Sequence, residues 1–141
     1  MAARQRCRRR PEQRIETASI ALGVVVVRLV EKINRGFKYT LGDRMMDASL
    51  GAAMDINTAC GYCPVRKRAR CLESAQEQLL RLETCVKMAL VGGQVTVDEK
   101  SKFDVFFEDV LGQLQDFLAA TNTKISSGQG PGGNAPGEMP D

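Results

Sequence analysis

Apolar residues recur every three to four positions in four blocks of the chain, which predicts four amphipathic α-helices. The blocks cover about residues 16–35, 41–60, 64–91 and 97–120. The positions expected to face one core are Ile15, Ala18, Leu22, Val26, Leu29 and Ile33; Leu41, Met45, Ala48, Ala52, Ile56 and Ala59; Leu72, Ala75, Leu79, Leu82, Val86 and Ala89; and Phe103, Phe107, Val110, Leu114 and Phe117. Long helices with short connections predict an all-α fold, an antiparallel up-down-up-down four-helix bundle.

Residues typical of helix ends separate the blocks. Glycines mark the predicted ends of the first three helices at Gly36, Gly61 and Gly92–Gly93. The segments Thr40–Asp43 and Thr96–Glu99 have the form of capping boxes, which predicts that the second and fourth helices begin there. Pro64 suits the first turn of the third helix.

The composition changes at both ends of the predicted bundle, which we expect to span residues 15–121. Residues 1–14 are rich in arginine and predict a basic, flexible N-terminal extension, and residues 122–141 are rich in Gly and Pro and predict a disordered tail. The apolar run Ile20–Val27 is far shorter than the roughly 20 residues that a membrane span needs. We therefore expect a cytoplasmic protein with no membrane partner.

The charges are divided unevenly along the chain. Residues 1–97 carry 17 Lys and Arg against 9 Asp and Glu, whereas residues 98–141 carry 3 against 8. Basic residues cluster near the N-terminus and at the start of the third helix, and positive charge continues along that helix. The candidate RNA-binding residues are Arg8, Arg9, Arg10, Arg66, Lys67, Arg68, Arg70, Arg81 and Lys87. The alternative is a solvated basic surface. Because aromatic residues are scarce, we expect recognition of phosphates and shape rather than of bases.

The sequence contains no set of catalytic residues. It has no His, which excludes His-activated nucleophiles and His-based metal sites, and it has five Cys without an obvious disulfide framework. Cys60 and Cys63 form a CxxC motif with Cys71 nearby, so a metal site or a redox pair is the alternative to ordinary reduced thiols. Cys85 lies about 20 Å along the helix from Cys71 and cannot join it on one ion. We expect no cofactor and no enzymatic activity.

One segment resembles a known family. Phe37–Arg44 is similar to the F-x-x-TLG-x-R segment that opens the second helix of the accessory variability determinant (Avd) proteins of diversity-generating retroelements, and Phe37, Thr40, Leu41, Gly42 and Arg44 carry the match. These proteins belong with the four-helix proteins encoded in intervening sequences of bacterial 23S rRNA. Further similar positions are Leu72, Ala75, Leu79, Leu82, Lys87 and Ala89, then Leu111, Gly112, Leu114 and Phe117, so the resemblance covers about residues 24–120.

The resemblance implies a non-catalytic accessory protein. Proteins of this family form a homopentameric barrel of four-helix bundles, bind the element's reverse transcriptase and template RNA, and support mutagenic cDNA synthesis and retrohoming. Apolar residues outside the core stripes also indicate subunit contacts, although scattered exposed apolar residues are common. They are Val24, Val25, Val27, Leu80, Met88, Phe106 and Leu118. The alternatives are an rRNA-intervening-sequence protein of unknown role and a metal- or redox-linked bundle that uses Cys60, Cys63 and Cys71.

Overall fold

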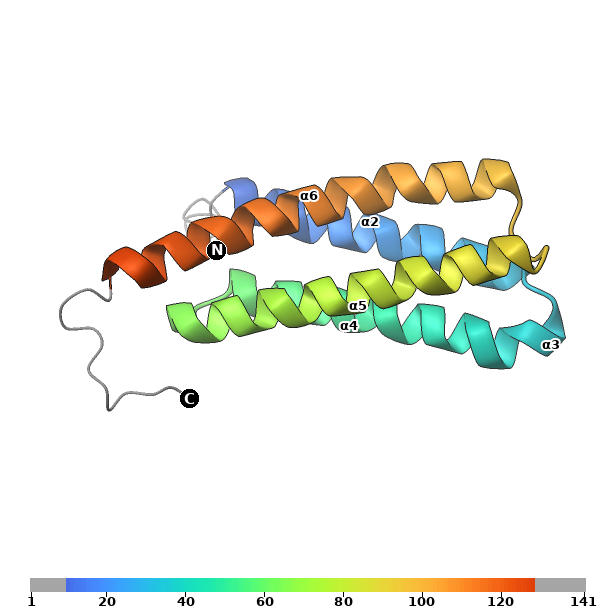
Figure 1. The fold of residues 1–141 in the computed structure, drawn as a ribbon, viewed down its shortest axis with the longest axis horizontal. Coiled ribbons are helices and arrows are strands. Elements are labelled where there is room, and N and C mark those ends of the chain that lie inside the picture. Colours follow the sequence, from blue (N-terminus) through green and yellow to red (C-terminus); the bar gives the residue numbers. More distant parts are fainter. Residues whose placement is uncertain (1–9, 129–141) are drawn as a thin grey trace, which may run out of the picture.

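The computed structural model describes residues 10–128 of the chain, and their side chains from Arg14 onward. Over this range the protein is a bundle of four long helices without a β-strand. The helices are α2 (Arg10–Lys32), α4 (Asp43–Cys60), α5 (Val65–Val91) and α6 (Val97–Gly128). They lie alongside one another, parallel to the long axis of the molecule (Figure 1). The predicted all-α four-helix bundle is confirmed.

The predicted apolar stripes form the core. All the predicted core positions are buried except Leu41 and Phe117, which are half-buried and pack against the core. The rings of Phe103 and Phe107 stack on α6 with their centroids 5.4 Å apart. Burial of one such large side chain stabilises the fold by about 1.5–3 kcal/mol, so these stripes explain why the four segments assemble.

Small residues let α2 and α4 approach closely. A Cβ placed on Gly23 would lie 3.6 Å from the Ser49 hydroxyl oxygen, and one placed on Gly42 would lie 3.1 Å from a methyl group of Val30. The second distance is too short for an unadjusted side chain. Gly42, one of the family-motif residues and the last residue before α4, therefore has a packing role against α2.

The connection from α2 to α4 differs from the prediction. Gly36 does not end the first helix, which stops at Lys32, and Thr40 forms no capping box, because its hydroxyl donates to the Phe37 carbonyl oxygen at 3.2 Å. Asn34 is the true cap: its side-chain oxygen accepts from the Gly36 amide at 3.3 Å. The chain then runs through the short helix α3 (Arg35–Phe37) and the π-helix η1 (Lys38–Gly42) directly into α4.

The turn from α5 to α6 confirms the predicted helix end at Gly92–Gly93 and the predicted helix start at Thr96. Gly93 adopts a positive φ of 76°, which favours glycine, and the Gln94 and Gly93 amides donate to the carbonyl oxygens of Ala89 and Leu90 at 2.8 and 3.0 Å. This pair of hydrogen bonds is a Schellman motif that ends α5. The predicted capping box of α6 is also formed: the Glu99 amide donates to the Thr96 hydroxyl at 3.1 Å, and the Thr96 amide to the Glu99 carboxylate at 2.9 Å.

The helices extend beyond the predicted bundle of residues 15–121. Arg10–Arg14 belong to α2 rather than to a flexible extension, and α6 continues to Gly128, so the prediction that disorder begins at residue 122 is wrong. Thr121, the last residue of the predicted bundle, is buried, and its hydroxyl donates to the Phe117 carbonyl oxygen at 2.8 Å. Its methyl group thus continues the inward stripe without leaving an unsatisfied polar group. Residues 1–9 and 129–141 of the predicted extension and tail lie outside the described residues.

Candidate nucleic-acid interface

The basic cluster of the third predicted helix lies in the first two turns of α5. Pro64 caps this helix with an extended backbone and without a side-chain hydrogen bond, and no acidic residue occupies the first turn. Four positive side chains, Arg66, Lys67, Arg68 and Arg70, therefore lie near the positive end of the helix dipole. A positive charge in the first turn opposes the dipole by roughly 0.3–1 kcal/mol, so the dipole does not explain the presence of Arg66 and Lys67 there.

Arg68 differs from the other three basic residues because its side chain is used inside the fold. Its Nε donates to the Ala59 carbonyl oxygen at 3.0 Å, in the last turn of α4. Its guanidinium carbon also lies 5.8 Å from the centroid of the Phe117 ring on α6. Arg68 thus links three helices and satisfies a carbonyl group at a helix end, whereas Arg66, Lys67 and Arg70 are exposed. We define these three exposed residues as the basic turn.

The remaining candidates on α5 are separate from the basic turn. Arg81 is exposed but lies 11 residues beyond Arg70, about 16 Å along the helix, with the exposed Glu73 and Glu77 between them. Lys87 lies 3.9 Å from the Glu83 carboxylate in an exposed ion pair. Positive charge on α5 is therefore concentrated in one turn and does not form a continuous stripe.

The N-terminal candidates lie at or before the start of α2 in the sequence. Arg8 and Arg9 lie outside the described residues, and Arg10 is the first residue of α2. Figure 1 shows the start of α2 and the start of α5 at the same end of the bundle, where the last turns of α6 also lie. The sequence could not indicate this proximity, because about 55 residues separate the two basic segments.

The family-motif residues lie at the opposite end, around α3 and η1 (Figure 1). Phe37, Thr40 and Arg44 are exposed, Leu41 is half-buried and Gly42 is buried. The motif therefore shapes the corner that leads into α4 and is not part of the basic turn.

The cysteines near the α4–α5 connection are all thiols. Cys60 is buried, whereas Cys63, Cys71 and Cys85 are half-buried, and Cys7 lies outside the described residues. Within residues 10–128 no three Cys, Asp or Glu side chains form a group that could hold a metal ion, so Cys60, Cys63 and Cys71 are not brought together as a metal site.

The environment of the thiols changes their acidity. Burial raises the pKa of the Cys71 thiol, and the negative charges of Asp55 and Cys63 raise it further, against the opposing charges of Lys67 and Arg70. Burial also raises the pKa of Cys85, against the charge of Arg44. Both thiols are therefore mainly protonated at neutral pH.

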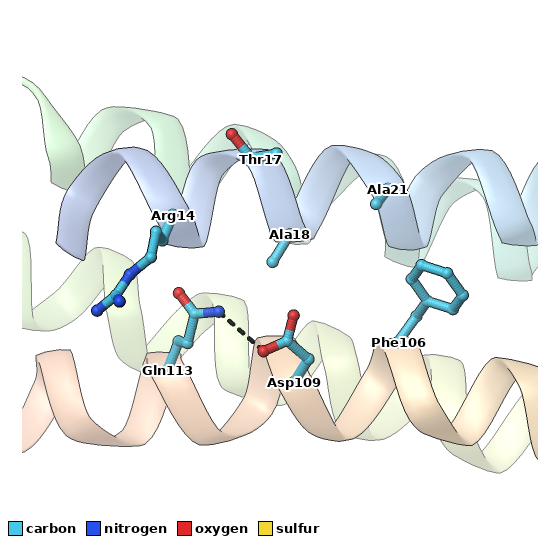
Figure 2. Close-up of a pocket in the computed structure, with 7 residues that line it drawn as sticks. All are labelled: Arg14, Thr17, Ala18, Ala21, Phe106, Asp109 and Gln113. Carbon is cyan, nitrogen blue, oxygen red and sulfur yellow. Dashed lines mark hydrogen bonds between the residues drawn. The ribbon is translucent and has the colours of Figure 1, made fainter. Parts of the chain in front are cut away.

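Sequence reasoning missed an open groove of about 890 Å³ between α2 and α6 (Figure 2). Its walls are formed by Arg14, Thr17, Ala18, Ala21, Phe106, Asp109 and Gln113. The Gln113 amide donates to the Asp109 carboxylate at 2.9 Å, so the main acidic group of the groove already has a partner. Small residues on α2 opposite a phenylalanine are the sequence signal for this hollow.

Comparison with known proteins leaves the family open. No protein-family model matches the chain, and the search of curated proteins gives no match. Among residues 10–128, no helix has the length and apolar character needed to cross a bilayer.

Proposed function

We propose that this protein is a non-catalytic accessory protein of the Avd type, which binds the reverse transcriptase and template RNA of a diversity-generating retroelement in the cytoplasm. It would support mutagenic cDNA synthesis and retrohoming by holding RNA and polymerase together. The resemblance of residues 24–120 supplies the partners in this proposal, and the four-helix bundle is compatible with it.

The observation that carries the proposal is the basic turn. Arg66, Lys67 and Arg70 are exposed, and the first two lie in the first turn of α5, where the helix dipole disfavours positive charge and no acidic residue is present. A phosphate backbone would contact these three exposed cations together. The start of α2, which follows another arginine-rich segment, lies at the same end and would extend the contact (Figure 1).

The same surface favours recognition of the backbone over recognition of bases. Tyr62 is 98% exposed just before α5 and is the aromatic side chain closest in sequence to the basic turn. One stacking ring beside several cations is typical of binding that depends on charge and shape. We therefore expect high salt sensitivity and little discrimination between RNA sequences of similar structure.

The test replaces the basic turn and leaves Arg68 in place. The triple variant Arg66→Gln, Lys67→Gln, Arg70→Gln is compared with the unchanged protein, both lacking residues 1–9 so that the arginines before α2 cannot compensate. Fluorescence anisotropy with template RNA should show much weaker binding and a flatter dependence on salt. The slope of log affinity against log salt should fall by roughly 0.7–0.9 for each phosphate contact removed.

The matched control is Arg81→Gln, which removes an exposed charge from the same helix away from the basic turn. It should alter affinity and slope far less than the triple variant. Equal affinity and slope for the triple variant and the unchanged protein would show that the basic turn is only a solvated surface. Co-purification of the full chain with a reverse transcriptase encoded beside it separates this proposal from an rRNA-intervening-sequence protein.

We further propose that the helices follow an up-down-up-down order and that five copies assemble into a ring. Exposed apolar residues on two neighbouring helices support an assembly: Ile20, Val24 and Val27 on α2, and Met46, Leu50 and Met54 on α4. Their spacing places each set on one face of its helix. In such a ring the basic turn would repeat, and weak phosphate contacts would combine through avidity.

A further inference from the structure

Two half-buried thiols lie on the seam between α4 and α5. Cys63 belongs to the connection between the helices, outside any helix, and its thiol donates to the Thr58 carbonyl oxygen at 3.7 Å. The connection is thereby folded back along the end of α4. Cys71 lies on α5 one heptad before Gln78, so the two side chains share one face of that helix.

The contacts between α4 and α5 place Cys71 at the level of Thr58. A Cβ on Gly51 would lie 2.9 Å from the Gln78 side-chain nitrogen, which shows that this face of α5 is turned toward α4. Nearer the start of α5, the Nε of Arg68 donates to the Ala59 carbonyl oxygen of α4 at 3.0 Å. Cys71 lies between Arg68 and Gln78 on α5, so it lies opposite residues 56–58 of α4, between Ala59 and Gly51. This is the level at which the Cys63 thiol is held by Thr58.

From this juxtaposition we propose that Cys63 and Cys71 form a redox-active dithiol pair, which closes to an intramolecular disulfide when a small disulfide oxidant is present. The electrostatic effect of Cys63 and Asp55 on Cys71 is independent support for the proximity of these groups. Because Cys63 lies outside the helices, its backbone can adjust to the geometry that a disulfide requires.

The oxidation proceeds by two thiol–disulfide exchanges with an oxidant such as oxidised glutathione. The deprotonated Cys63 sulfur attacks the oxidant, which forms a mixed disulfide and releases one glutathione thiolate. The deprotonated Cys71 sulfur then attacks the Cys63 sulfur and releases the second glutathione thiolate. The two released thiolates take up the two protons that the cysteines lost, so two protein thiols are oxidised and one oxidant disulfide is reduced.

The other cysteines of the described region are less suited to this pairing. Cys60 is buried in the last turn of α4, away from an incoming oxidant. Cys85 lies 14 residues from Cys71, about 21 Å along α5. The pair therefore joins the third and fourth cysteines of the chain and bypasses the CxxC motif.

The proposed bridge would enclose all four basic residues at the start of α5 in a short covalent loop, residues 63–71. It would tie the first two turns of α5 to the connection and reduce the freedom of the unfolded chain there. We expect the oxidised protein to unfold at a temperature about 5 °C or more above that of the reduced protein. This inference does not depend on RNA binding, so each proposal can fail separately.

The experiment treats the reduced full chain with oxidised glutathione, alkylates the remaining thiols and digests the protein with trypsin without reduction. Trypsin cuts among the basic residues and places Cys63 in the peptide 45–66, which also holds Cys60, and Cys71 in the peptide 71–81. The expected product is a linked pair of these peptides, two hydrogen atoms lighter than their sum, formed equally well by a Cys60→Ser variant.

Variants make the result decisive. Cys63→Ser and Cys71→Ser should each abolish the intramolecular bridge and the rise in unfolding temperature while the helical circular dichroism stays unchanged. Cys85→Ser is the matched control, since this thiol is also half-buried on α5, and it should leave both effects intact. A Cys60–Cys63 bridge, a bridge from Cys7, a linked dimer, or glutathione retained on Cys63 or Cys71 would overturn the proposal.

Discussion

At the level of single residues, Arg68 shows that a basic cluster can contain side chains with different roles. Its neighbours Arg66, Lys67 and Arg70 are exposed, whereas its own guanidinium contacts α4 and α6. The position in the sequence alone does not distinguish the four residues, because the distinction depends on which side of α5 faces the end of α4. Arg68 therefore belongs with the groups that hold the bundle together.

Replacement of Arg68 by alanine should destabilise the fold. The variant loses a hydrogen bond from a charged donor and a cation–π contact with Phe117, and we expect a loss of about 1–2 kcal/mol in the free energy of unfolding. Arg68→Lys should recover little of this, because an ammonium group lacks the planar fork. Urea denaturation followed by circular dichroism measures both values.

The matched control for this prediction is Arg81→Ala, which removes an exposed arginine from the same helix. Its free energy of unfolding should stay within about 0.5 kcal/mol of that of the unchanged protein. If Arg68→Ala were as stable as Arg81→Ala, the contacts of Arg68 would contribute no net stability.

At the level of helices, the two predicted capping boxes had different outcomes. The one at Thr96 is formed with Glu99, whereas the one at Thr40 is replaced by a cap at Asn34 and a π-helical turn. Asn34 is also held by a tertiary contact, because its backbone N–H donates to the side-chain oxygen of Gln94 at 2.8 Å. A tertiary contact thus decides where the second helical segment begins.

The capping box of α6 should make stability depend on pH. Hydrogen bonding from the Thr96 backbone and from Lys32, whose amine lies 2.9 Å from the carboxylate, holds the pKa of Glu99 below its ordinary value of 4.5. The unfolded chain therefore takes up the proton first as the pH falls. The stabilisation is complete above pH 4.5 and is lost as the pH falls through the lower pKa of the folded state.

Glu99→Gln tests this dependence, because glutamine can keep the capping hydrogen bond but carries no charge. We expect the free energy of unfolding to fall less steeply below pH 4.5 in this variant than in the unchanged protein. Glu108→Gln, an exposed position on the same helix, is the control and should keep the original slope. Identical slopes for Glu99→Gln and the unchanged protein, from urea titrations at several pH values, would contradict the role of Glu99.

Helix periodicity carried most of the information about the fold. The a/d spacing from Leu72 to Ala89 predicts the face of α5 that is buried, because regular burial imposes this spacing on the sequence. The end of α6 was missed because residues 122–128 are polar or small apart from Ile125, so no apolar periodicity marks them as helical. The sequence identified the basic cluster, but neither the structural role of Arg68 within it nor the proximity of the basic turn to the start of α2 follows from a linear pattern.

At the level of the whole molecule, α2 has more apolar surface than the bundle covers. Its outer residues Ile20, Val24 and Val27 are 62%, 46% and 40% exposed, and on the adjacent α4 Leu50 is 61% exposed. A helix that is apolar on most of its circumference is typically covered on more than one side. The proposed ring of five copies would supply this cover.

The last prediction concerns this assembly. Light scattering on the full chain should give a particle of five chain masses at micromolar concentration, and the double variant Ile20→Glu, Leu50→Glu should give a smaller one. Each substitution would bury a carboxylate without a partner in an apolar contact, a change that strongly opposes association. Since both positions are exposed in the single chain, the helical circular dichroism of the variant should be retained.

Val97→Glu is the control for surface charge in general. Val97 is 71% exposed at the first position of α6, and an acidic residue is favourable at the start of a helix. This variant should keep the mass of the unchanged protein. A monomer for the unchanged protein would exclude the ring, and a pentamer that survives the double variant would place its contacts on other helices. In the second case, another copy of the chain would not be what covers the apolar face of α2.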